Sequence, residues 1–173
     1  MTWPRPVRVV GVGSPFGDDA AAWEVVRQLQ RQKEWGGEIE FHAVEGGHRL
    51  IDLLDGRGTL FLVDALAAFP SPLSSTIGGE GSVGAWTPGT IERLEWPDTR
   101  LEALRPGTTH HLRPAEALQL AAALNFLPSR VVVWGIAGEC FDPPSRLSPA
   151  VAAAVPLLVH HIRILEFAQL GAC

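Results

Sequence analysis

The sequence of 173 residues contains little cysteine and little positive charge. Its two cysteines, Cys140 and Cys173, form no CxxC pair, which excludes a disulfide framework and a cysteine-based zinc site and favours a reducing cytoplasm. Lys and Arg total 14 against 19 acidic residues, for a net charge of -5, and they form no basic cluster. A nucleic-acid partner is therefore not expected.

Long apolar runs are also missing. Charged residues make up 19% of the chain, and no stretch is apolar enough throughout to cross a membrane. The apolar run near the N-terminus leads into a glycine turn and an acidic pair, without the cleavage pattern of a signal peptide. We expect a cytoplasmic protein without membrane insertion, folded as a single domain over residues 1–173 and monomeric.

Apolar residues are spaced alternately for strands and for helices along the chain. The run at 59–64 is almost wholly apolar, as in a central strand that is covered on both faces. This alternation predicts an α/β protein, a three-layer α/β/α sandwich with a mainly parallel sheet and an edge strand near residues 90–96. The expected strands are 7–12, 38–44, 59–64, 90–96 and 130–136. The expected helices begin at 18, 49, 114 and 149, the last with Ser148 as its N-cap and Pro149 at its first position.

Acidic residues follow several of these strands. Asp19, Glu45, Asp64 and Glu139 all lie at predicted carboxyl ends, where ligands gather in parallel sheets, and His110 precedes a helix on the same side. A buried ionised carboxylate such as Asp64 requires a partner. Two carboxylates and an imidazole form a mixed oxygen and nitrogen set that suits a borderline divalent ion with open positions for substrate.

Each of these features also has a plainer interpretation. Asp18 and Asp19 stand where helix N-caps and first turns favour aspartate. His110 and His111 fit equally well as loop residues. The glycines between Gly11 and Gly17 resemble a dinucleotide fingerprint, but the third is displaced and two aspartates follow, which argues against a nucleotide.

A receiver-like signalling domain is a further alternative, because it also has acidic residues after its first strand and an aspartate at the end of its third. Its phosphoacceptor chemistry usually needs a lysine after the last strand, whereas the only lysine here is Lys33. We therefore set this alternative aside.

Six segments, in this order and at this spacing, together resemble the hydrogenase maturation endopeptidase family over nearly the whole chain. Any one of them alone would be a weak signal. The segments are GVGSPFGDD at the first strand end, EGGHRLIDLL at Glu45–Leu54, LVDAL at Leu62–Leu66, TPGT at Thr87–Thr90, THHLRPAEALQLA at Thr109–Ala121, and VWGIAGE followed by LSPAV.

The resemblance implies a five-stranded mixed sheet with one antiparallel edge strand, of the phosphorylase/hydrolase-like kind. It also implies that Asp19, Asp64 and His110 contact a metal ion and that Asp19 and Asp64 are the catalytic residues. We favour His110 over His111 because the family's acidic helix residue then falls on Glu116.

Some residues depart from the family pattern. The chain has Ser14, Ala20 and His48 where family members commonly have Asn, Gly and Thr. His48 either adds a ligand or lines the substrate cleft, and we favour the cleft, together with Gly46 and Gly47, whose lack of side chains permits close approach of a peptide.

By resemblance, the chain is expected to be an aspartic-type or metal-assisted endopeptidase. Its substrate and partner would be a nickel-iron hydrogenase large-subunit precursor from which it removes the C-terminal extension. Nickel would be carried by that substrate, or another divalent ion would occupy the same site. The alternative is a non-catalytic maturation factor of the same fold that holds metal or precursor without cutting.

Overall fold

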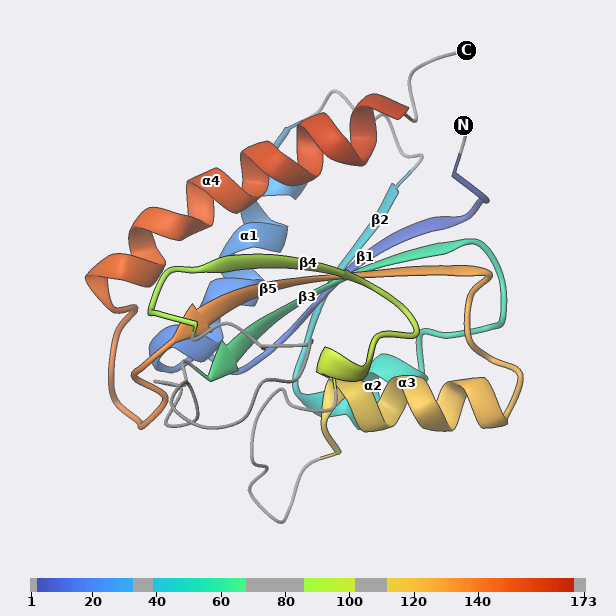
Figure 1. Ribbon diagram of the computed structural model, residues 1–173, viewed down its shortest axis with the longest axis horizontal. Helices are drawn as coiled ribbons and strands as arrows, with labels where there is room; N and C mark the ends of the chain where they lie inside the picture. The colour runs from blue at the N-terminus through green and yellow to red at the C-terminus, as the bar shows by residue number, and fades with distance from the viewer. Residues whose placement is uncertain (1–2, 33–38, 68–85, 102–111, 170–173) are drawn as a thin grey trace, which may run out of the picture.

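A five-stranded sheet forms the centre of the protein in a computed structural model that describes residues 3–32, 39–67, 86–101 and 112–169 (Figure 1). The strand order is β2-β1-β3-β5-β4, and β4 alone in this sheet runs antiparallel to its neighbour β5. The predicted mixed sheet with an antiparallel edge strand is thus confirmed. Its strands are β1 (Val7–Val12), β2 (Ile39–Val44), β3 (Thr59–Ala67), β4 (Ile91–Glu95) and β5 (Arg130–Gly138).

Helices cover both faces of the sheet, which confirms the three-layer α/β/α sandwich (Figure 1). One face carries α1 (Ala21–Gln30) and α4 (Pro149–Leu165), and the opposite face carries α2 (Gly46–Ile51) and α3 (Pro114–Ala123). Short 3-10 turns add η1 (Gly17–Ala20), η3 (Thr99–Leu101) and η4 (Phe167–Gln169). The single domain over 1–173 includes segments outside the described residues and stays a prediction.

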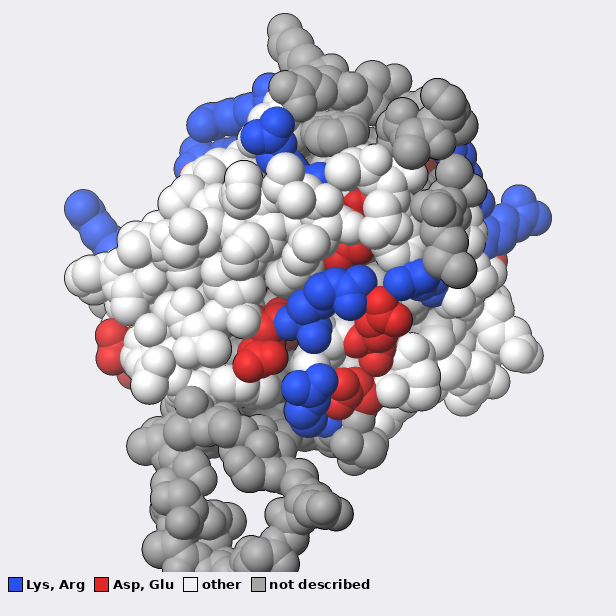
Figure 2. All heavy atoms as spheres, turned by 45° about the horizontal axis from the view of Figure 1, so that its top comes forward, with Lys and Arg blue, Asp and Glu red and all other residues white. Residues whose placement is uncertain are grey.

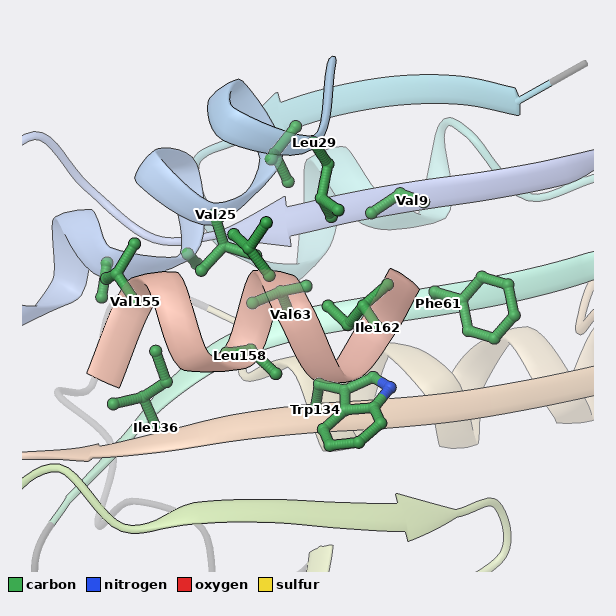
Figure 3. Packing of buried hydrophobic residues seen from close by; sticks show 14 of the residues in the cluster. Val9, Val25, Leu29, Phe61, Val63, Trp134, Ile136, Val155, Leu158 and Ile162 are labelled. Carbon is green, nitrogen blue, oxygen red and sulfur yellow. The ribbon is translucent and has the colours of Figure 1, made fainter. Parts of the chain in front are cut away.

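Each face of the sheet has its own hydrophobic core. Under α1 and α4, Val25 and Leu158 meet sheet side chains such as Phe61 and Trp134 (Figure 3). Under α2 and α3, Leu50 and the buried face of α3 cover the alternate side chains of the same strands. Because the central strands are covered on both faces, they read as continuous apolar runs in the sequence.

Helix α4 is long and apolar. Together with η4 it spans Pro149–Gln169 and includes an 18-residue stretch with a mean hydropathy of 1.5. By length and composition alone this segment could cross a membrane, so the expectation that no stretch is apolar enough is wrong. Its inner face packs on the sheet, and 44% of that 18-residue stretch is buried inside the protein. Its outer face exposes Leu157, Ile164 and Leu165. Figure 2 shows acidic and basic side chains gathered in a band, next to a broad surface without charged residues.

Two elements differ from the sequence-based expectation. Strand β3 continues three residues beyond Asp64, because Ala65–Ala67 pair with Ile136–Gly138 of β5 after β1 has ended. Helix α2 begins at Gly46 rather than at Arg49. Gly46 and Gly47, which were expected in a turn before the helix, are therefore its first two residues.

An ion-pair network joins β1 to β2 and to the turn before β3. Arg8 donates to Asp55 at 2.8 and 3.0 Å and to Glu40 at 2.8 Å. The hydrogen bonds from Arg8 lower the pKa of Asp55 to about 2 from its ordinary 3.8.

We expect Asp55→Asn to lower the free energy of unfolding at pH 7 by less than about 1 kcal/mol, because the Asp55 side chain is 46% exposed. A depressed pKa stabilises the folded state above pH 3.8, and this contribution disappears as the pH falls to 2. Urea unfolding of both proteins should therefore show a difference at pH 7 that vanishes near pH 2. A difference that grows in acid would contradict this assignment.

Candidate active site

The carboxyl end of β1 lies beside Asp64 of β3 at the point where the chain reverses its direction across the sheet. After β1 the chain crosses to β2 through α1 on one face, and after β2 it returns to β3 through α2 on the other face. Such a switch point leaves a crevice at the strand ends that open α/β proteins use for ligands. Asp19 follows β1 and Asp64 belongs to β3, so both residues lie at this edge.

Asp19 lies in η1, tight against the end of β1. Gly13 follows β1 directly, and its N–H donates to the Val44 carbonyl at 3.0 Å. A Cβ on Gly13 would overlap the Asp19 carbonyl oxygen and would come within 3.7 Å of the Asp19 carboxyl carbon. The missing side chain at position 13 therefore lets the Asp19 backbone and carboxylate approach the strand end.

Asp64 lies inside β3, opposite Val12 of β1 and Gly135 of β5. The expectation that it ends the strand is wrong, but it does lie level with the last residue of β1. Its side chain points toward the α2 and α3 face and is only 7% exposed. The small pocket there is otherwise apolar in the part of the chain that the structure describes, with Leu62, Asp64, Leu101, Pro114, Ala115, Leu118 and Val133 as its lining.

Asp18 does not serve as the helix cap that its position suggests. It is fully buried, and its carboxylate accepts hydrogen bonds from the backbone N–H groups of Glu139, Cys140 and Ser148. These donors lie in the connection between β5 and α4. Asp18 therefore anchors the loop after β1 to the loop after β5. Its neighbour Asp19 is only half-buried.

The glycines expected in a substrate cleft begin α2. Gly47 is buried, its N–H donates to the Leu112 carbonyl at 2.8 Å, and His48 beside it is exposed. The lack of a side chain at Gly47 is thus explained by packing inside the protein, because it leaves room for the backbone of Leu112 and Arg113 just before α3. A role of Gly46, Gly47 and His48 toward substrate stays a prediction.

Replacing Gly47 with alanine should cost about 1 to 3 kcal/mol of stability, because the new Cβ would lie 2.7 and 2.8 Å from the carbonyl oxygens of Leu112 and Arg113. A matched control is His48→Ala, which trims an exposed side chain in the same helix and should change stability by less than about 0.5 kcal/mol. Thermal unfolding of the two variants provides the comparison. Equal stabilities of the two variants would show that the backbone near Leu112 and Arg113 moves aside for the new Cβ without a loss of stability.

The histidines expected at this edge, His110 and His111, lie outside the described residues. Within residues 3–32, 39–67, 86–101 and 112–169, no three His, Cys, Asp or Glu side chains are grouped so that they could hold a metal ion. Glu116 is described, and it caps α3 by accepting from the Arg113 backbone N–H at 3.0 Å and from its guanidinium. The Arg113 side chain also lowers the pKa of Glu116 below its ordinary value.

The chemistry of this edge depends on oxygen donors. Glu45 and Glu139, which follow β2 and β5, are exposed at the same rim as the more sheltered Asp19 and Asp64. Carboxylates suit hard and borderline divalent ions, and paired carboxylates also suit proton transfer to and from water.

Neither a protein-family model nor a curated protein matches the sequence. Solved structures do match. The hydrogenase maturating endopeptidase HybD from E. coli has a TM-score of 0.71 at 20% identity and covers 95% of this chain and 94% of that one. HybD, a [NiFe] hydrogenase maturation protease from Thermococcus kodakarensis, has a TM-score of 0.62 at 18% identity and covers 93% and 99%.

A hydrogenase 2 maturation peptidase from the Thaumarchaeota archaeon SCGC_AB-539-E09 has a TM-score of 0.56 at 21% identity, with 96% and 99% covered. These likenesses span nearly the whole length of both chains, so they concern the complete layered sheet rather than one motif. This chain therefore has the fold of the hydrogenase maturation endopeptidases.

Proposed function

We propose that the protein is an endopeptidase that removes the C-terminal extension of a nickel-loaded nickel-iron hydrogenase large-subunit precursor. The observation that carries this proposal is that Asp19 packs against Gly13 directly after β1, while Asp64 of β3 lies opposite Val12, the last residue of β1, at the switch point of the sheet. The shared fold and the sequence segments quoted above support the substrate class.

Nickel enters this proposal as part of the substrate. Asp19 and Asp64 supply carboxylate oxygens, and His110, two residues before the tethered Leu112, supplies an imidazole nitrogen. Such a mixed set suits a borderline ion and leaves positions for the precursor's own ligands. Recognition of the ion would then place the scissile peptide beside the two carboxylates, so that only metal-loaded precursor is cut.

Hydrolysis requires that water add to the peptide carbonyl carbon, that the C–N bond break, and that a proton reach the leaving amine. A carboxylate at this edge is suited to take the proton from water and to pass it to the amine. The half-buried setting of Asp19 and the nearly buried setting of Asp64 limit competing solvent. Both groups thus serve positioning and proton transfer.

Incubation of the purified chain with nickel-loaded precursor, and separately with nickel-free precursor, tests the proposal. Mass spectrometry should detect a released C-terminal peptide and a correspondingly shorter large subunit in the nickel-loaded sample alone. Binding without any loss of mass would favour the alternative, a maturation factor that holds metal or precursor without cutting. Equal cleavage of both samples would exclude recognition of nickel.

We also propose that the reaction takes place in the cytoplasm with the protein as a monomer. The low cysteine content supports this compartment. Sedimentation of the purified chain tests the oligomeric state, with a single species near 18.6 kDa as the expected result.

A further inference from the structure

Asp18 connects two loops that are far apart in the sequence. Its Oδ2 accepts hydrogen bonds from the N–H groups of Glu139 at 2.9 Å and Cys140 at 3.0 Å, and its Oδ1 accepts one from Ser148 at 2.6 Å. The side chain is 0% exposed. Three N–H donors directed at one buried side chain require a group that only accepts, which an ionised carboxylate provides.

The backbone around Asp18 strengthens this connection. The Asp18 N–H donates to the Cys140 carbonyl at 2.7 Å, and the Gly17 N–H donates to the Ser145 carbonyl at 2.8 Å. On the other side, a Cβ at Gly138 would lie 2.7 Å from the Cβ of Asp18, so the end of β5 packs closely on this residue. The loop after β1 is thus fastened to the loop after β5 through main-chain and side-chain bonds together.

Asp19 is therefore held from two directions. Its carbonyl group packs against Gly13, where no Cβ fits, and its N-terminal neighbour is the buried Asp18. With the main chain fixed on both sides, the Asp19 carboxylate retains little freedom beyond its own side-chain torsions. Fixing a reactive group in advance avoids the cost of ordering it when substrate binds.

We propose that Asp18 is a positioning residue, which fixes the Asp19 carboxylate for recognition of the nickel-loaded precursor; this inference rests on the proposed function. The role requires a carboxylate. An asparagine of the same shape would direct its NH₂ group at Ser148 or at the Glu139 and Cys140 pair, so that donor would face donor.

The test is the dissociation constant for nickel-loaded and for nickel-free precursor, measured with folded wild-type, Asp18→Asn and Asp142→Asn proteins. Asp142 is an exposed carboxylate in the same β5–α4 connection and serves as the matched control. We expect Asp18→Asn to reduce the preference for nickel-loaded precursor at least 10-fold, and Asp142→Asn to leave it unchanged. The ratio of the two constants is the decisive quantity, because a smaller folded fraction weakens both affinities alike.

The outcomes separate the two proposals. A wild-type protein with no preference for nickel-loaded precursor would overturn the proposed function. A wild-type preference that Asp18→Asn retains would overturn the positioning role alone.

If Asp18→Asn does not fold, amide hydrogen exchange in the wild-type protein supplies the second measurement. The amides of Glu139, Cys140 and Ser148 should exchange slowly, and nickel-loaded precursor should slow them at least 10-fold further in the wild-type chain but not in Asp19→Asn. The same protection in both chains, or none in either, would contradict a link from Asp18 to substrate through Asp19.

Discussion

Replacement of Asp19 by asparagine is expected to lower the rate of precursor processing roughly 10²- to 10⁴-fold, the range for loss of a group that transfers protons in a transition state. The Asp19 side chain is half-buried rather than part of the core, so the fold should survive the change. An amide keeps the shape of the carboxylate but loses its charge and its basicity. The rate is measured by mass spectrometry of the shortened large subunit, with circular dichroism to verify folding.

The matched control for Asp19→Asn is Glu139→Gln. It removes an equal charge from an exposed position on the same rim and should change the processing rate less than 3-fold, since exposed charges interact weakly across solvent. Wild-type processing by folded Asp19→Asn would refute the assignment. An equal loss in both variants would show that the rim acts through its overall negative charge.

The largest expected loss of stability comes from Glu166→Ala. The Glu166 side chain is 0% exposed and accepts hydrogen bonds from Arg93 at 2.7 Å and from the Trp134 indole at 3.2 Å. Its removal leaves an arginine and an indole N–H without their acceptor, which costs roughly 3 to 5 kcal/mol for a buried pair. Because Arg93 is 31% exposed, we expect about 2 to 4 kcal/mol.

Urea unfolding of Glu95→Ala supplies the control for Glu166→Ala. Glu95 also pairs with Arg93, at 2.9 Å, but its side chain is 50% exposed, so its loss should cost less than about 1 kcal/mol. Similar losses in both variants would mean that burial of Glu166 contributes nothing beyond an ordinary surface pair.

The layered fold could be predicted because local signals agree with it. The apolar run at 59–64 indicated a central strand, and Pro149 after Ser148 marked the start of α4 correctly. The limits of β3 could not be predicted, because its last three residues depend on pairing with β5 beyond the end of β1. That pairing is a property of the sheet and leaves no sign in the local sequence.

The candidate site was predicted in part. Asp19 does follow β1, and Asp64 lies level with the last residue of β1, but Asp64 is inside β3 and not at its end. The roles of Asp18 and Glu166 escaped sequence reasoning, since their partners lie far away in the sequence, at separations that run from 32 residues for Trp134 to 130 for Ser148. An aspartate before a helix has a local explanation as a cap, and nothing in the sequence distinguishes a cap from an anchor.

X-ray absorption at the nickel edge tests most directly whether Asp19, Asp64 and His110 contact the ion of the precursor. Spectra would be recorded for nickel-loaded precursor alone and for its complex with this chain, frozen before turnover. We expect additional oxygen and nitrogen neighbours around nickel in the complex, with fewer when Asp19→Asn replaces the wild-type chain. An unchanged nickel spectrum in a complex that has demonstrably formed would contradict this expectation.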